Sequence, residues 1–298
     1  MRELKSSALI RRQNNGEGSF VAASIPRSSA KVRPYSFRSI LTVDAGLDSM
    51  ALLSMKLTFL GTRGEIDVRT PRHRMHSSLL VSWRRTHVMI DCGADWQKWR
   101  VAKIAPTAMV ITHAHPDHAD GLKKGVSCPV FATQESWNAM RPGPIPQRVV
   151  IEPRCPFDIH GIRFEAFPIE HSLRAPAVGY RITTDRTALF YAPDIVSIHD
   201  RQAALAGIHL YAGDGASITR PILRRRGDAF IGHASIRMQL EWCRDEGVPG
   251  AVFTHCGTQI VSGNERVMNE TVASLGRQFG VAAKIAFDGM EILLRSSS

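Results

Sequence analysis

The sequence predicts an α/β protein in which strands dominate the first part of the chain and strands alternate with helices further on. Three observations favour this class: short apolar segments bounded by turn residues, two segments with helical periodicity, and a length of 298 residues of which 44% are hydrophobic. This length and composition suffice for one large hydrophobic core or two smaller ones. No apolar run approaches the roughly 18 residues that are needed to span a membrane.

The first 54 residues differ in composition from the rest of the chain. They are rich in Ser, Arg, Ala and Asn and show no sustained periodicity. We interpret residues 1–54 as a disordered or misassigned N-terminal extension, with Met55 as an alternative initiator, and residues 55–298 as the folded domain. A transit peptide is the competing interpretation because arginines outnumber acids there, but the segment lacks a clear amphipathic pattern.

Strand-like segments begin directly after this extension. Residues 55–62 predict a first strand, and residues 77–83 and 87–92 predict a hairpin that turns at Arg84 and Arg85. Further strands are expected at residues 108–111, at residues 157–167 with a turn at His160-Gly161, at residues 178–191 with a turn at Thr184-Asp185, and at residues 251–254. Two helices are expected at residues 235–246 and 264–279, because apolar residues share one face there and a glycine follows each segment.

A cluster of ionisable residues follows one of these strand-like segments. The run Thr-His-Ala-His-Pro-Asp-His-Ala-Asp places His113, His115, Asp117 and His118 within six positions. Imidazole nitrogens and carboxylate oxygens are ligands that suit zinc, iron and manganese. His113 and His115, as alternate residues after a strand, can share one ion, whereas Asp117 and His118 follow the break at the proline and can reach a second. A solvated His-rich loop is the alternative interpretation.

Three further ligand-type residues stand at the ends of apolar segments. His171, Asp194 and His255 each follow a strand-like run. An ionisable group at such an edge is costly to bury without a partner. Each of them alone would more often contact solvent or backbone, but their common position favours additional ligands of a metal site.

The order of these residues resembles the five sequence motifs of the metallo-β-lactamase superfamily over about residues 55–295. The resembling set is Asp91, His113, His115, Asp117, His118, His171, Asp194 and His255. The resemblance implies a four-layer αβ/βα sandwich, in which sheets flanked by helices form two similar halves. It also implies a metal-dependent hydrolase with two divalent metal ions. We expect Zn²⁺ and keep Mn²⁺ or iron as alternatives, because His and carboxylate ligands without thiolate do not select strongly.

The resemblance assigns roles to these residues. His113, His115 and His171 would hold one metal, Asp117, His118 and His255 the other, and Asp194 would bridge the two. Asp91 would orient a ligand or shape the adjacent loop. Two ions close together lower the pKa of a shared water, so a metal-bridging hydroxide would be the nucleophile. Such a site serves carbonyl and phosphoryl substrates alike, so the metals do not name the reaction.

A further histidine favours phosphodiester chemistry. The run Gly232-His233-Ala234-Ser235 opens an expected helix, and it resembles a motif of the phosphodiesterase branch of the superfamily, which includes ribonuclease Z and a cyclic-phosphate phosphodiesterase. By that resemblance His233 contacts the scissile phosphate or protonates the leaving oxygen, and joins Asp117 as a catalytic residue. A histidine at a helix N-terminus lies in a positive field with free N–H groups that suit a phosphate. An incidental histidine near a helix cap is the alternative.

The charge balance supports the same chemistry weakly. The formal net charge is +11, and Arg224, Arg225 and Arg226 lie shortly before His233. These arginines form either a solvated face or a contact with a phosphate or an RNA backbone. The 5 cysteines contain no Cys-x-x-Cys pair, which indicates a reducing compartment rather than a disulfide framework.

We therefore expect a cytoplasmic, binuclear phosphodiesterase that acts on a small phosphodiester or an RNA. No membrane partner is expected, and a homodimer is left open. A thioesterase or lactonase of the same fold is the alternative, and a non-hydrolytic metal-binding protein is a third interpretation. His233 best separates the first two, because a carbonyl hydrolase has no need of a histidine at that place.

Overall fold

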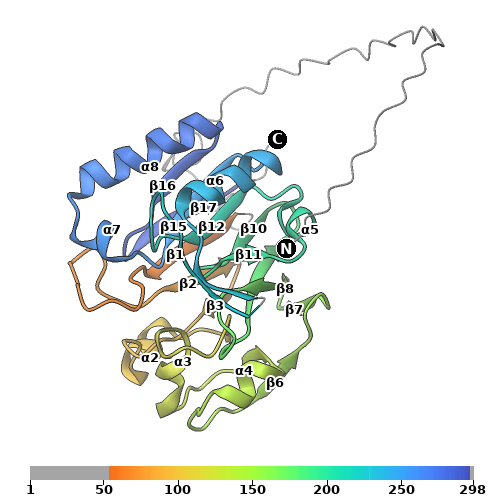
Figure 1. The fold of residues 1–298 in the computed structure, drawn as a ribbon. Coiled ribbons are helices and arrows are strands. Elements are labelled where there is room, and N and C mark those ends of the chain that lie inside the picture. The colour runs from red at the N-terminus through yellow and green to blue at the C-terminus, as the bar shows by residue number, and fades with distance from the viewer. Residues whose placement is uncertain (1–53, 228, 296–298) are drawn as a thin grey trace, which may run out of the picture. The chain divides into compact units, whose positions relative to one another are not determined.

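Two β-sheets pack face to face in the computed structural model, which describes residues 54–227 and 229–295 (Figure 1). The expected extension lies outside the described residues except for Ser54, so that interpretation stays a prediction. The first sheet has the strand order β17-β1-β2-β3-β4-β5-β6. Its strands are β1 (Met55–Gly61), β2 (Ser78–Trp83), β3 (Thr86–Ile90), β4 (Ala108–Val110), β5 (Val130–Thr133), β6 (Arg148–Ile151) and β17 (Met290–Leu294).

The second sheet has the order β11-β8-β9-β10-β12-β15-β16, and β7 pairs with β8 beside this path. Its strands are β7 (Phe157–Ile159), β8 (Ile162–Glu170), β9 (Ala177–Thr183), β10 (Ala188–Tyr191), β11 (Ser197–Ile198), β12 (Leu210–Asp214), β15 (Gly250–Thr254) and β16 (Ala282–Ile285). A separate two-stranded ribbon consists of β13 (Ile222–Arg226) and β14 (Ala229–His233). The hairpin turns expected at Arg84-Arg85, His160-Gly161 and Thr184-Asp185 are confirmed.

The two long helices predicted from periodicity are also confirmed. α6 (Ile236–Asp245) begins after Ser235, whose hydroxyl accepts a hydrogen bond from the Met238 N–H. α8 (Glu265–Phe279) ends at Gly280, whose φ of 72° gives the left-handed cap that favours glycine. The shorter helices are α2 (Lys98–Ile104), α3 (Pro116–Ala119), η2 (Asp120–Lys124), α4 (Gln134–Ala139), α5 (Arg201–Leu205) and α7 (Thr258–Ser262). None of the described helices is long and apolar enough to cross a membrane.

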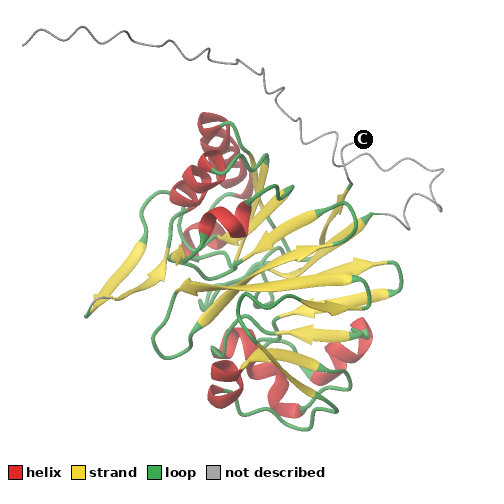
Figure 2. Cartoon of the chain, turned by 90° about the vertical axis from the view of Figure 1, so that its right-hand side faces the viewer, coloured by secondary structure: helices red, strands yellow, loops and turns green. Residues whose placement is uncertain are grey.

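Three hydrophobic cores separate four layers. The central core lies between the two sheets and includes Leu57 and Phe164, both fully buried. A second core joins the outer face of the second sheet to α6 and α8, with Leu240 and Val272 in it. A third core joins the first sheet to α2 and its neighbours through residues such as Val101. Helices therefore cover the outer face of each sheet (Figures 1 and 2), and the expected four-layer αβ/βα sandwich is confirmed.

Parallel pairing brings several chain segments to one edge of each sheet. In the first sheet β3 runs parallel to β4, and β4 to β5. In the second sheet β10, β12 and β15 run parallel to one another. Strands such as β12 and β15 are buried at every position, as is typical of parallel strands covered on both faces. Polar side chains that follow such strands therefore gather at the same edge.

We expect a chain that begins at Met55 to fold and to keep the melting temperature of the full chain. Met55 is fully buried and starts the ladder that β1 forms with β17. A chain that begins at Gly61 is the control, because it lacks nearly all of β1, an interior strand of the first sheet, and should not fold. Thermal unfolding followed by circular dichroism compares the three chains. A melting temperature far below that of the full chain for the Met55 variant would show that the extension stabilises the domain.

Candidate metal centre

The ligand-type residues found in the sequence follow strand ends at one edge of the two sheets. The strands and the residues that follow them are β3 and Asp91, β4 and His113, β8 and His171, β10 and Asp194, and β15 and His255. The remaining three lie at α3: His115 is the residue just before the helix, and Asp117 and His118 lie within it. Pro116 starts this helix at its first position, where its missing N–H costs nothing.

Three imidazole rings and one carboxylate form the first ligand group. His115 Nδ1 lies 3.0 Å from His113 Nε2 and 3.2 Å from His171 Nε2. Asp194 Oδ2 lies 3.4 Å from the same two Nε2 atoms. Burial lowers the pKa of His115 to about 4 and also lowers the pKa values of His113 and His171. These rings are therefore neutral at pH 7, and each offers a lone pair to a cation.

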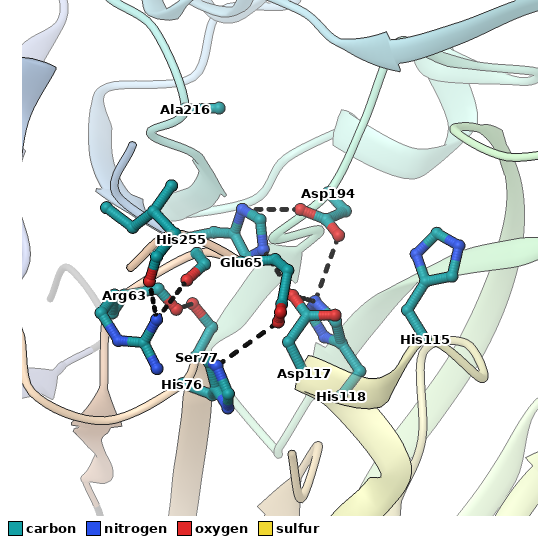
Figure 3. Close-up of polar contacts among 12 residues, drawn as sticks. Arg63, Glu65, His76, Ser77, His115, Asp117, His118, Asp194, Ala216 and His255 are labelled. Carbon is teal, nitrogen blue, oxygen red and sulfur yellow. Dashed lines mark hydrogen bonds and ion pairs between the residues drawn. The ribbon is translucent and has the colours of Figure 1, made fainter. Parts of the chain in front are cut away.

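The second ligand group contains two carboxylates and two imidazoles. His118 Nε2 lies 3.2 Å from Asp117 Oδ2 and 3.1 Å from Asp194 Oδ2. His255 Nε2 lies 3.0 Å from Asp117 Oδ2, and His255 Nδ1 lies 2.7 Å from Asp194 Oδ1 (Figure 3). In each group, one ligand atom from every residue lies within 4.8 Å of the others, and Asp194 belongs to both groups.

Without cations, the carboxylates of the second group hold protons on its histidines. Burial disfavours the charged ring of His255, but Asp194 and Asp117 outweigh burial and raise the pKa of His255 to about 10. Asp117, Asp91 and Asp194 likewise raise the pKa of His118 above its ordinary value against the effect of burial. A metal ion that bound here would have to displace these protons, because only deprotonated imidazole is a ligand.

The donor set fits divalent cations. His118 Nε2, Asp194 Oδ1 and His255 Nδ1 are buried and have no hydrogen-bond partner among the described residues, although opposite charges lie close by. An unsatisfied buried polar atom costs about 1–3 kcal/mol. Nitrogen and oxygen donors in two groups of four suit zinc and related ions. The three unpaired atoms belong to residues of the second group, and a cation there would give each of them a partner.

Neighbouring residues fix the ring nitrogens that face the two groups. His118 Nδ1 donates to Asp91 Oδ2 over 2.8 Å, and Asp91 Oδ1 accepts from the Thr112 N–H over 2.8 Å. His171 Nδ1 donates to the Gly232 carbonyl over 3.0 Å. The Nε2 atoms of His118 and His171 are therefore left for a metal. Asp91 thus contacts a ligand-type residue, and its role in orienting that residue stays a prediction.

Backbone strain accompanies two of these residues. Asp91 has a φ of 63° and His255 a φ of 52°, both in the left-handed region that non-glycine residues rarely adopt. Such conformations cost on the order of 1–3 kcal/mol and persist only where the surroundings enforce them. At Gly93 a Cβ would lie 1.8 Å from the Asp117 carbonyl oxygen. This close approach allows the loop after β3 to pack against α3.

A cleft of about 720 Å³ opens over the two groups, and Glu65 lies on its wall (Figure 3). The Glu65 side chain is 68% exposed, and its Oε2 lies 3.4 Å from His76 Nε2. The buried Arg63 guanidinium holds this loop, because it donates to the carbonyls of Gly64 and Ile66 and pairs with Asp95 over 2.6 Å. The backbone of the loop is therefore held in place, and the exposed Glu65 carboxylate lies at the wall of the cleft.

His233 also lines the cleft, and a buried carboxylate holds its ring. His233 Nδ1 donates to Asp214 Oδ2 over 2.8 Å and lies 3.6 Å from Asp194 Oδ1. Burial opposes the charged ring, but Asp214 outweighs it and raises the pKa of His233. Asp214 is itself fixed, because its Oδ2 accepts from the Ile195 N–H.

The expected helix N-terminus beside His233 is not available to a phosphate. His233 is the last residue of β14 rather than part of the helix. The first N–H groups of α6 are already bonded, because Ile236 donates to the Ser217 carbonyl and Arg237 to the Ile218 carbonyl. The free N–H groups that the sequence suggested are absent from this part of the described chain, so that reason for phosphate binding was wrong.

The three arginines lie outside the cleft lining. Arg224, Arg225 and Arg226 are exposed on β13, whereas Ile222 at the start of the same strand lines the cleft. The expectation that they contact a phosphate or an RNA backbone stays a prediction.

Sequence reasoning missed Asp214 and Glu65. Asp214 ends the apolar strand β12 in the same way as the residues that were recognised. It therefore carried a usable signal, but it was not among the residues whose order resembles the family motifs. Glu65 stands in an exposed loop, and nothing in its local sequence marks it. Glu65 reaches the cleft only because its loop folds beside His255. The loop backbone and the His255 ring are so close that a Cβ at Gly64 would lie 3.0 Å from the ring.

A sequence model of the beta-lactamase superfamily domain matches residues 86–256. The chain therefore belongs to the beta-lactamase superfamily, and the described fold is the metallo-beta-lactamase fold. The matched segment contains both ligand groups and His233 but excludes β1 and the Glu65 loop. No curated protein matches the sequence.

Several solved structures share this fold. The metallo-beta-lactamase fold protein YhfI from Bacillus subtilis is 15% identical with a TM-score of 0.64, over 81% of this chain and 99% of that one. A diphosphatase of the PhnP family is 17% identical with a TM-score of 0.59, over 81% and 97%. Human tRNase Z, short form, is 17% identical with a TM-score of 0.53, over 80% and 98%. At these identities the similarity establishes the fold alone.

We expect Asp91→Asn to weaken zinc binding roughly 10- to 100-fold, the usual effect of losing a residue that orients a ligand. Asn tolerates the left-handed backbone of Asp91, and its oxygen can still accept from Thr112. Its NH₂ group, however, would face His118 Nδ1 and move the ring proton to Nε2, which then could not bind a metal. Competition with a chromophoric chelator measures the affinity, and the melting temperature of the metal-free variant controls for folding. Unchanged affinity would contradict the role given to Asp91.

Proposed function

We propose that this protein is a binuclear metal-dependent hydrolase of phosphodiesters. His233 carries the proposal, because Asp214 holds its ring on the cleft wall beside the two ligand groups. An imidazole in this place can donate a hydrogen bond or a proton to a phosphate oxygen. A carbonyl hydrolase would need no additional donor there.

Two bound metal ions are part of the proposal, because Asp194 is shared by the two groups of four ligand-type residues described above. Asp194 and His255 also form a third such group with Asp214 and His233, which overlaps the second group and which we do not assign to an ion of its own. His113, His115 and His171 would hold one ion, Asp117, His118 and His255 the other, and Asp194 would contact both. Two divalent ions, with Zn²⁺ expected, would supply an activated water and would neutralise charge on the phosphoryl oxygens when bound to these residues. Asp117 and His118, on the short helix α3, would orient the second ion.

Asp214 determines which nitrogen of His233 is available to the substrate. The Nδ1–H of His233 donates to Asp214 Oδ2, which leaves Nε2 as the free ring nitrogen. A donor at Nε2 would bind a non-bridging phosphate oxygen or deliver its proton to the leaving alkoxide. The names of two similar structures, a diphosphatase and a tRNase Z, support phosphate chemistry on this fold, although a fold by itself does not fix a substrate.

A substrate panel tests the proposal against its alternative. The zinc-loaded protein is assayed with bis-p-nitrophenyl phosphate, a cyclic nucleotide, a lactone and a thioester. Hydrolysis of the phosphodiesters at rates well above those of the carbonyl substrates is the expected result. Preferential turnover of the lactone or thioester would replace the proposal with the thioesterase or lactonase interpretation.

We expect the isolated protein to bind close to two metal ions per chain and the Asp194→Ala variant to bind fewer. The sequence predicted two ligand groups with Asp194 as their shared residue. Loss of Asp194 should therefore weaken metal binding in both groups. Asp120→Ala is the matched control, because Asp120 lies in the same His-rich run but pairs with Lys123 over 2.7 Å. Elemental analysis after dialysis gives the metal content. An Asp194→Ala protein with undiminished metal content would remove Asp194 from the shared position.

We expect His233→Ala to keep both metals and to lose roughly 100-fold or more in phosphodiester turnover, the usual scale of general acid catalysis. The loss should be smaller for a p-nitrophenolate leaving group, which needs little protonation, and larger for an alkoxide. Asp214→Asn should show the same dependence on the leaving group to a lesser degree. This variant leaves the His233 ring in place but removes the negative charge that helps the ring to hold its proton. Loss of metal from His233→Ala would make His233 a ligand, and normal turnover of every phosphodiester would refute the proposed role.

A further inference from the structure

The ribbon of β13 and β14 is a separate two-stranded sheet that joins the cleft directly. Its strands pair with each other in the register Ile222↔His233, Arg224↔Ile231 and Arg226↔Ala229. The pair Ile222 and His233 lies at its base, and both residues line the cleft. Figure 2 shows a two-stranded ribbon that projects from the layered body of the molecule. The ribbon therefore extends from the cleft into solvent.

Strand geometry divides the arginines between the two faces of this ribbon. Alternate residues of a strand share a face, and directly paired residues share it too. Arg224 and Arg226 therefore lie on the same face as Ile222 and His233. Arg225 lies on the opposite face. Along the first face, the arginine positions follow Ile222 at steps of about 7 Å.

The contacts of the three arginines also separate Arg225 from Arg224 and Arg226. Arg225 Nε donates to the Gly227 carbonyl over 2.9 Å at the end of the ribbon. Arg224 and Arg226 are exposed and have no hydrogen bond or ion pair with any residue that the structure describes. Two permanent positive charges on the face that leads to the cleft are thus left for an external anion.

We propose that this face of the ribbon binds the backbone of a single-stranded nucleic acid and leads it into the cleft. Arg224 and Arg226 would each contact a phosphate outside the cleft while the phosphodiester to be cleaved lies beside His233. This inference rests on the proposed function and makes the substrate a strand of several nucleotides.

Two observations favour a single strand over smaller or double-stranded substrates. Arg226 lies four strand positions from Ile222, about 13 Å along the ribbon, which a mononucleotide at the cleft would not span. The ligand-type residues at the base of the cleft are at most 6% exposed apart from His115. A flexible single strand can bend its backbone toward such buried groups more easily than a stiff duplex can. The formal net charge of +11 also favours a polyanion.

The test compares three single variants of the full, zinc-loaded chain: Arg224→Ala, Arg226→Ala and, as the matched control, Arg225→Ala. All three remove one charge from the same strand, so net charge cannot distinguish them. The probes are fluorescent 12-nucleotide single strands of RNA and of DNA and a duplex of the same sequence. Fluorescence anisotropy at several salt concentrations gives Kd, and the kcat/KM values for the single strand and for bis-p-nitrophenyl phosphate are compared.

We expect Arg224→Ala and Arg226→Ala each to weaken single-strand binding roughly fivefold and to reduce the slope of log Kd against log salt by about 0.7. In the same two variants, kcat/KM for the single strand should fall relative to kcat/KM for bis-p-nitrophenyl phosphate. Arg225→Ala should change the affinity, the salt slope and this ratio much less. Equal losses in all three variants would overturn the proposal, because they would reflect net charge alone. Duplex binding as tight as single-strand binding would also overturn it.

Failure of the proposed function is distinguishable from failure of this inference. If the wild-type protein hydrolysed no phosphodiester, the proposed function would fall. The binding measurements would still decide the ribbon face, because they need no turnover. If Arg224→Ala and Arg226→Ala bound the strand as tightly as the wild type, the ribbon face would be excluded even for an active phosphodiesterase.

Discussion

The buried carboxylate of Asp194 is the group on which the rest of the site depends. It lies after β10, and ring nitrogens of His113, His118, His171 and His255 lie within 3.4 Å of it. A carboxylate buried in this way is stable only when positive charge or hydrogen bonds compensate it. The compensating groups come from both sheets, so the requirement of one carboxylate links the two halves of the sandwich. Cations in the two ligand groups would serve the same purpose more completely than protons do.

The histidines of the two ligand groups have different protonation states before any metal ion binds. The rings of the first group are neutral because burial lowers their pKa values. Those of the second group are held protonated by Asp117 and Asp194. A cation that enters the first group meets free lone pairs, whereas one that enters the second must displace protons. The left-handed backbone at Asp91 and His255 lies beside this second group, so strain, buried charge and proton competition are concentrated there.

The cleft wall is electrically uneven. On one side the loop fixed by Arg63 presents the Glu65 carboxylate, and on another Asp214 holds His233 beside the base of an arginine-bearing ribbon. A polyanion such as the proposed substrate would be repelled by the first feature and attracted by the second, and would therefore have a preferred direction of approach. The ribbon thus connects two features that the sequence presented separately, a Gly-His motif and an arginine run. They are the two ends of one β-hairpin face.

The sequence by itself determined the fold class, the two long helices, three hairpin turns and the residue types at the candidate metal centre. These depend on local patterns: periodicity, turn residues and ligand-type side chains after apolar strands. Tertiary structure alone decided the partner of His233, because Asp214 reaches it only when the ends of β12 and β14 meet. It also decided that the first N–H groups of α6 are occupied by carbonyls from residues 217 and 218, which no pattern within the helix reveals. Finally, strand register divided three consecutive arginines between two faces, because the side-chain period of a strand is fixed while its pairing depends on the whole fold.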